Sequence, residues 1–341
     1  MQNMTEVVTS GVGELFQNKT LGEKLRLSHH QEVDFSPPFS RVSNRGRIPS
    51  SYPLCAAAQQ NKTISSPIIA EKYQIFEQVE GSSLYRCVNI ETQEELVCKI
   101  LPKNNHVLVS AHYKLDSLTR ISPLHEVIVR NTNLFLFFPK PHGDLHSYVR
   151  SRKKLRESEA KKLFRQIVET VQICHNNGIV LRDLKLRKFV FADKQRTELR
   201  LESLEDAVVL EDTDNDCLHD KRGCPAYVSP EILKAGHYSG KAADMWSLGV
   251  ILYTMLVGRY PFSDSEHASL FAKISKGNFM IPDCISPRAR CLINSLLRRD
   301  PTERLTSEDI MYHPWLAKND EDWNNRLSCD QVVPQNWTLF D

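Results

Sequence analysis

The spacing of apolar residues changes once along this chain, near Gly143, and that change predicts its architecture. Before Gly143, short segments rich in β-branched and aromatic residues are bounded by turn residues, which is typical of strands. We expect strands at residues 73–76, 84–88, 95–100 and 134–138, with a hairpin turn at residues 91–94. This first part of the folded region is therefore predicted to be a small β-sheet.

Beyond Gly143 the spacing becomes helical. Residues 158–174 carry apolar side chains at the i, i+3 and i+4 positions of one buried stripe, and Gly178 is placed to end that helix. Residues 244–256 are apolar almost all round, as a core helix should be. A small β-rich lobe followed by a larger helical lobe gives the fold class α+β.

The two ends of the chain show neither period. Residues 1–70 are rich in Ser, Asn and Gln and contain several prolines, so they bury too little apolar surface to offset chain entropy and are predicted to be disordered. Residues 317–341 carry more acidic than basic side chains and are predicted to be a flexible tail. The folded domain is then residues 71–316, with an N-lobe at about 71–140 and a C-lobe at about 141–316.

The composition argues against several classes of protein. A formal net charge of +2 is too balanced to indicate binding to nucleic acid or to an acidic membrane. The 9 cysteines are scattered, with no CxxC pair and no spacing of a zinc site, so we expect a reducing compartment and no metal. No apolar run follows the first Met, and the longest run, residues 248–257, is about half of a membrane span. We therefore expect an intracellular protein.

Five short motifs follow one another in a fixed order. They are residues 96–99 ending in Lys99, Leu181-Arg182-Asp183-Leu184-Lys185, Ser229-Pro230-Glu231, residues 244–249 beginning with Asp244, and Arg304. This order resembles that of the protein kinases: the phosphate-binding lysine, the H-R-D-L-K catalytic loop, the A-P-E end of the activation segment, the D-x-W-S-x-G helix start and a late arginine. The resemblance implies a bilobal protein-kinase fold in which Glu231, Asp244 and Arg304 are structural and Arg304 pairs with Glu231.

Both groups that hold magnesium in such kinases are replaced. The D-F-G position reads Ser203-Leu204-Glu205, and serine is uncharged and a poor magnesium ligand. The asparagine five residues after the catalytic aspartate is Lys188, which puts a cation where the metal should lie. We therefore expect no metal site and no dependence on magnesium.

The nucleotide-binding features are also reduced. Only one glycine, Gly81, occurs between Phe76 and Val88, whereas a glycine-rich loop needs small residues so that its N–H groups can approach phosphate. Residues 96–125 contain no glutamate to pair with the lysine, and Asp116 is the only acid there. Leu181 replaces the histidine of the catalytic loop. We expect ATP binding to be weak or absent, with no cofactor required.

Four kinase residues survive, and they admit two interpretations. They are Lys99, Arg182, Asp183 and Lys185. In the first interpretation they support residual nucleotide binding through Lys99, or a weak, metal-independent kinase. In the second they are vestigial scaffold, with Lys99 paired with Glu205 or another acid. We favour the second, because charge loss of this type costs orders of magnitude in rate.

Several segments resemble the Tribbles pseudokinases in particular. They are residues 181–189, 201–206, 240–244 and 255–262, within a resemblance that covers residues 72–316 and the tail. The family implies a catalytically impaired adaptor that presents transcription factors of the CCAAT/enhancer-binding type to a constitutive-photomorphogenic-type E3 ubiquitin ligase for degradation. It also implies negative regulation of protein kinases, modulation of MAP kinase and Akt signalling, and a location in nucleus and cytoplasm. Substrates would dock near residues 203–231, and the tail would pack on the small lobe until substrate binds.

The tail carries a segment that resembles the family's ligand for the WD40 domain of that ligase. The segment is Asp330, Gln331, Val332, Val333 and Pro334. A residue before proline is held extended, so the segment can present side chains to a groove. The family usually has an acid after the proline, and here that residue is Gln335.

Two other segments have both a functional and a structural interpretation. Ile310, His313, Pro314 and Trp315 resemble the family's site for MAP kinase kinases, but kinases commonly end their last helix in this way and Trp315 is as readily explained as core. The basic residues are Arg150, Arg152, Lys153, Lys154 and Arg156. They could form a nuclear import signal or a face for acidic segments, or simply a solvated helix end. His175 and the other histidines show no ligand spacing, so no function is assigned to them.

Overall fold

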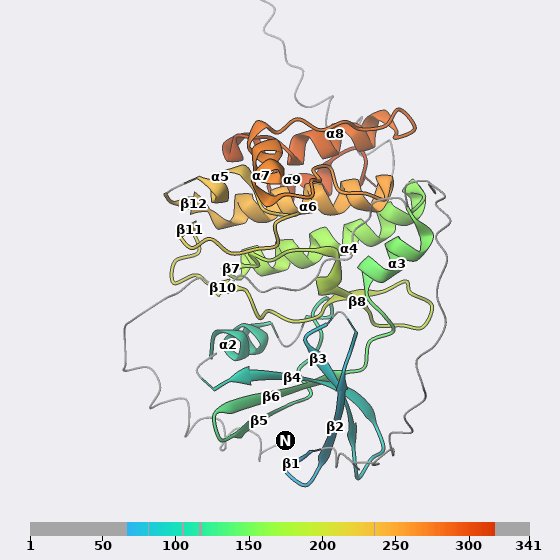
Figure 1. Ribbon diagram of the computed structural model, residues 1–341, viewed down its shortest axis with the longest axis vertical. Helices are drawn as coiled ribbons and strands as arrows, with labels where there is room; N and C mark the ends of the chain where they lie inside the picture. The colour runs from blue at the N-terminus through green and yellow to red at the C-terminus, as the bar shows by residue number, and fades with distance from the viewer. Residues whose placement is uncertain (1–66, 81, 104–105, 116–117, 235, 318–341) are drawn as a thin grey trace, which may run out of the picture. The chain divides into compact units, whose positions relative to one another are not determined.

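The computed structural model describes residues 67–317 except 81, 104–105, 116–117 and 235 (Figure 1). Residues 1–66 and the tail with Asp330–Pro334 lie outside the described residues, as do Gly81 and Asp116.

The first part of the described chain forms one six-stranded antiparallel sheet in the order β1-β2-β3-β4-β6-β5 (Figure 1). The strands are β1 Ile68–Ile69, β2 Tyr73–Gln78, β3 Leu84–Asn89, β4 Glu95–Pro102, β5 Glu126–Arg130 and β6 Asn133–Pro139. The four strands predicted from the sequence are confirmed as β2, β3, β4 and β6. The edge strands β1 and β5 were missed, because β1 has two residues and β5 alternates weakly, with Val129 55% exposed.

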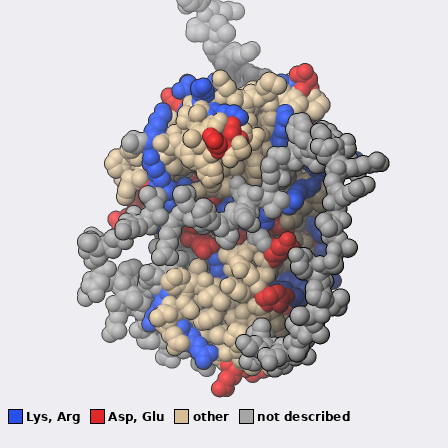
Figure 2. Space-filling model, viewed as in Figure 1, with Lys and Arg blue, Asp and Glu red and all other residues tan. Residues whose placement is uncertain are grey.

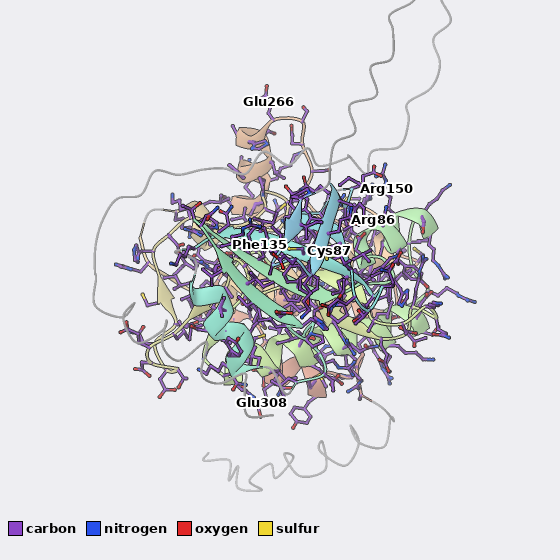
Figure 3. The ribbon with its side chains drawn as sticks, turned by 90° about the horizontal axis from the view of Figure 1, so that it is seen from below. Arg86, Cys87, Phe135, Arg150, Glu266 and Glu308 are labelled. Atoms are coloured by element: carbon purple, nitrogen blue, oxygen red, sulfur yellow. The ribbon has the colours of Figure 1, made fainter. Side chains whose placement is uncertain are left out.

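The sheet buries both faces because its strands alternate. One face holds a small cluster in which Tyr73 stacks on Phe137, with ring centroids 3.9 Å apart, and Cys87 and Phe135 also belong to it (Figure 3). The other face, with Val97 and residues from neighbouring strands, joins the main core of the protein. Helix α2, His106–Lys114, contributes to that core through Ala111. Burial on two sides fixes the register of β4, which places Lys99 between β3 and β6.

The second part is helical. Its helices are α3 Leu145–Arg152, α4 Glu157–Asn176, α5 Pro230–Leu233, α6 Gly240–Val257, α7 His267–Lys276, α8 Pro287–Leu296 and α9 Ser307–Tyr312. Both predicted helices are confirmed as α4 and α6. Helix α6 begins four residues earlier than expected, because the Ser239 hydroxyl caps it by accepting from the Ala242 amide. It ends at Gly258, whose φ is +81°, and a Cβ there would lie 1.9 Å from the carbonyl oxygen of Lys153.

Three small antiparallel pairs lie in the segments around the helices. They are β7 Ile179–Val180 with β10 Val208–Val209, β8 Phe189–Phe191 with β9 Leu199–Leu201, and β11 Cys217–Leu218 with β12 Tyr238–Ser239. The β8–β9 hairpin pairs Phe189 with Leu201, which brings the segment before β8 beside the segment after β9. These are the two segments in which the sequence predicts replaced metal ligands.

One buried ion pair ties the helical part together, and it is the pair predicted from the sequence. The Arg304 guanidinium donates to both carboxylate oxygens of Glu231, at 2.6 and 2.7 Å, and to the carbonyl oxygen of Ala242 at 2.8 Å. The Arg304 side chain is 1% exposed. Because its donors all have acceptors, the pair links α5, α6 and the segment before α9 without leaving a charge uncompensated.

The surface has no strongly charged face in the view of Figure 2, where acidic and basic side chains are interspersed. In the described part of the chain, no helix has both the length and the apolar character needed to cross a membrane.

Replacing Arg304 with alanine leaves the Glu231 carboxylate buried without its partner. We expect the free energy of unfolding to fall by about 3–5 kcal/mol, the usual cost of breaking a buried ion pair. Urea unfolding followed by circular dichroism measures this loss. Arg86→Ala is the matched control, because its pair with Glu77 is exposed to solvent and should contribute little. Equal effects of the two substitutions would contradict the role of Arg304.

Candidate functional site

Asp244 fixes the loop that contains the L-R-D-L-K motif. Its buried carboxylate accepts from the amide of Leu181 at 2.8 Å and from that of Arg182 at 2.9 Å. His175 Nε2 lies 2.9 Å from the same carboxylate. Asp244 at the start of α6 therefore holds the loop against α4. No function was assigned to His175 from its spacing. Its contact with Asp244 gives it a structural role.

Arg182 connects this loop to the segments that follow β9. Its φ of +62° lies in the left-handed region, and its Nε donates to the Asp206 carbonyl oxygen at 2.6 Å. The guanidinium also pairs with the carboxylate of Asp220, which lies after β11. The side chain thus joins three segments that are distant in sequence, as the scaffold interpretation predicts.

Lys188 lies in the middle of a group of acids. It ends the short 3-10 helix η2, Leu186–Lys188, and its carbonyl accepts from the Glu202 amide at 2.7 Å across the β8–β9 hairpin. Its Nζ is 2.8 Å from Asp206 Oδ2 and 4.0 Å from Asp183 Oδ2. Asp183 is also 2.7 Å from the Nζ of Lys185. The ammonium of Lys188 therefore lies between two carboxylates, which is the arrangement that a bound cation would have.

The charge states of Lys188 and Asp206 follow from these contacts. Burial alone would lower the pKa of Lys188, but the carboxylates of Asp206 and Asp183 raise it above its ordinary value. Burial alone would raise the pKa of Asp206, but the Lys188 ammonium brings it below its ordinary value of 3.8. Both groups are therefore charged at neutral pH.

Lys99 forms a second ion pair of this site, with Glu205. Its side chain is 1% exposed, its Nζ pairs with Glu205, and it also donates to the Ser203 hydroxyl at 3.2 Å. The pairing of Lys99 with Glu205 was one of the options left open by the sequence, and it is confirmed. The ammonium that would bind phosphate in a kinase is thus neutralised by the residue that replaces the D-F-G glycine. Leu204, between these two replacements, is buried in the core.

Helix α2 places the uncharged imidazole of His112 near Lys99. His112 is 3% exposed and packs against Phe138, with ring centroids 5.4 Å apart. Burial, and after it the charge of Lys99, lower the pKa of His112 to about 4, so the ring is uncharged at neutral pH. Residues 96–125 contain no glutamate, and the residue that α2 places near Lys99 is His112 instead. Sequence reasoning gave no signal for it.

We call these six charged residues the charge cluster: Lys99, Asp183, Lys185, Lys188, Glu205 and Asp206. Its three ammonium groups and three carboxylates cancel formally. The cavity next to Asp183, Lys188 and Asp206 has a volume of about 10 Å³, which is room for about one water. Within the described residues, no three His, Cys, Asp or Glu side chains are grouped to hold a metal ion. The residues present do not fit magnesium, because their carboxylates already contact ammonium groups.

The other candidate residues lie apart from the charge cluster. Ile310 and Trp315 are buried, and Trp315 Nε1 donates to Glu157 at 3.1 Å, while His313 and Pro314 are only half-buried. The exposed basic residues at the end of α3 include Arg152, which is paired with Glu159. The structural interpretation therefore accounts for Ile310 and Trp315.

Comparisons with known proteins agree with this geometry. Residues 78–316 match the family model described as protein kinase domain. The chain is 51% identical to Tribbles homolog 2 of Mus musculus over 269 residues, which cover 77% of this chain and 78% of that protein. It is 53% identical to Tribbles homolog 1 of Homo sapiens over 268 residues, covering 77% and 72%. It is 50% identical to Tribbles homolog 3 of Mus musculus over 309 residues, covering 87% of each.

Lys188→Met removes the ammonium and keeps a side chain of similar length. We expect the free energy of unfolding at pH 7 to fall by about 2–3 kcal/mol, less than for a fully buried pair because the Asp206 side chain is 32% exposed. In the unaltered chain, the contribution of Asp206 is complete above pH 3.8 and is lost as the pH falls through its lower folded pKa. In Lys188→Met, burial raises the pKa of Asp206, so the difference between the two proteins should shrink in acid. Urea unfolding at several pH values measures it.

The control for this experiment is Lys194→Met, which removes an exposed cation after β8. Its effect should stay within about 0.5 kcal/mol at every pH. A loss for Lys188→Met that is no larger than this, or that is independent of pH, would show that the pairing of Lys188 and Asp206 does not stabilise the fold.

Proposed function

The chain belongs to the protein kinase family and, within it, to the Tribbles proteins, and on that premise we propose that it is a pseudokinase adaptor. Its kinase-like domain binds a substrate protein and its tail binds a ubiquitin ligase. The contact of Lys188 with Asp206 and Asp183 is the main support for this proposal, because the Lys188 ammonium lies where a kinase would hold its metal ion.

The chemistry of phosphoryl transfer supports the loss of catalysis. The reaction depends on magnesium that bridges the β- and γ-phosphates and on a lysine of the sheet that contacts the nucleotide phosphates. Here Lys99 is paired with Glu205, and Lys188 lies against Asp206. In this proposal ATP and magnesium are not required, and any ATP binding through Lys99 would first have to displace Glu205.

The segment that follows the charge cluster supports a role in presenting substrate. Asp220 is held by Arg182, and its carbonyl oxygen accepts from the Tyr238 hydroxyl at 2.8 Å. A segment anchored at several points offers a partner a surface that needs little ordering on binding. We assign this surface, within residues 203–231, to transcription-factor substrates of the CCAAT/enhancer-binding type.

The remaining parts of the proposal rest on the family resemblance. The ligase binds Asp330–Pro334 through its WD40 domain, and the protein acts in nucleus and cytoplasm on Akt and MAP kinase kinases. Because Ile310 and Trp315 are buried, direct contact with a MAP kinase kinase would fall to His313 and Pro314. No nucleic acid or membrane partner is proposed.

Val333→Ala combined with Pro334→Ala should abolish capture of the ligase, because both the apolar side chain and the extended backbone of the ligand are removed. Pull-down of the purified WD40 domain by the full chain measures this, with binding of a substrate peptide measured in parallel. Substrate binding should be unchanged. The control is Thr338→Ala, which alters the tail outside the ligand. Ligase capture that survives the double substitution would refute the adaptor.

A further inference from the structure

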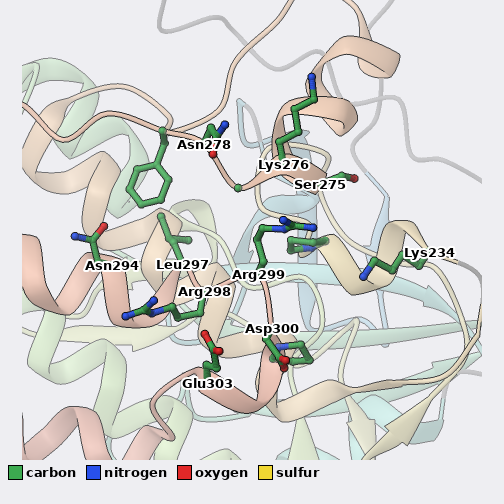
Figure 4. A pocket seen from close by; sticks show the side chains of 14 residues that line it. Lys234, Ser275, Lys276, Asn278, Asn294, Leu297, Arg298, Arg299, Asp300 and Glu303 are labelled. Carbon is green, nitrogen blue, oxygen red and sulfur yellow. The ribbon is translucent and has the colours of Figure 1, made fainter.

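A second concavity lies in the helical part, outside the charge cluster. It has a volume of about 840 Å³ and is lined by α5, by the end of α7 with the loop that follows it, and by the segment after α8 (Figure 4). Its charged lining residues are Lys234, Lys276, Arg298, Arg299, Asp300 and Glu303. We call this concavity the basic hollow, since four of these six residues are cations.

The cations of the basic hollow outnumber its two acids, Asp300 and Glu303, by two. Within the described residues none of the four lies in an ion pair, whereas Lys99, Lys188 and Arg304 do. Figure 4 shows Lys234 and Arg299 pointing toward one another. The single charge of Asp300, which acts on Lys234, can offset only one of these two cations. Two like charges that face one another are stabilised by an anion between them.

The two arginines are held by a rigid frame. The buried Arg304 guanidinium, which pairs with Glu231 of α5, also donates to the carbonyl oxygens of Arg298 at 2.9 Å and Arg299 at 3.5 Å. The stem of Arg299 lies against Gly277, whose φ is +67°, and a Cβ there would be 2.5 Å from Arg299 Cγ. The same core pair therefore fixes α5, which ends just before Lys234, and the backbone that carries the arginines. The backbone at these positions therefore needs little ordering when an anion binds.

We propose that the basic hollow binds a compact polyphosphate, a small molecule that carries several phosphate groups. Guanidinium groups bind phosphate oxygens in a bidentate manner, and the lining adds the polar side chains of Ser275, Asn278 and Asn294. The volume lies in the usual range of small-molecule sites. Cations from three segments meet a compact polyanion on several sides, whereas the single phosphate of a phosphopeptide would engage one pair. This ligand class is independent of the proposed adaptor function.

Sodium tripolyphosphate is the probe for the test. Isothermal titration calorimetry of the full chain should show saturable binding that weakens as salt is added. The double variant Lys234→Ala with Arg299→Ala should weaken binding by about tenfold or more, because two charge-assisted contacts are lost. The matched control is Arg150→Ala with Lys154→Ala, which removes the same charge from exposed residues near α3. It should change the affinity by less than about twofold.

Three results would overturn the proposal. Equal weakening in the two double variants would mean that the chain binds polyanions non-specifically. A lack of saturable binding to the unaltered chain would exclude the site. Binding of a phosphoserine peptide, without binding of tripolyphosphate, would assign the basic hollow to a protein partner instead. Thermal unfolding of each variant establishes that it is folded, and Arg299→Lys, which keeps the charge but loses the bidentate contact, should give an intermediate affinity.

Discussion

The ammonium of Lys188, lying between Asp206 and Asp183, is the contact on which the rest of this site depends. Two carboxylates brought together by the β8–β9 hairpin and the loop held by Asp244 need a cation. In a kinase a metal ion can supply that charge when nucleotide binds, whereas here a side chain supplies it permanently. The loop and the segment after β9 are therefore stabilised without a ligand.

Elsewhere in the charge cluster, too, side chains pair with one another instead of with a ligand. Glu205 pairs with the ammonium of Lys99, and Arg182 joins the loop to Asp220. Each pair alone contributes modestly, but as a network they link the sheet to the helical part. The Arg304–Glu231 pair plays the corresponding role at the other end of the segment.

Most of the fold could be predicted from the sequence, because strand and helix periods and the motif order are local signals. The Arg304–Glu231 pair followed from motif positions, and the Lys99–Glu205 pair was one of the options that the sequence left open. Contacts that depend on long-range packing could not be predicted: His175 meets Asp244 only once α4 and α6 pack together. The basic hollow is a further example, because Lys234 and Arg299 converge only through the frame around Arg304.

The central claim is that a side-chain cation replaces magnesium. Thermal unfolding of the full chain with ATP, with and without magnesium, tests it most directly, because a ligand that binds the folded state raises the melting temperature. The account predicts that magnesium gives no further stabilisation at any ATP concentration. Stabilisation by ATP that requires magnesium would mean that Lys188 yields its place to the metal, and would contradict the account.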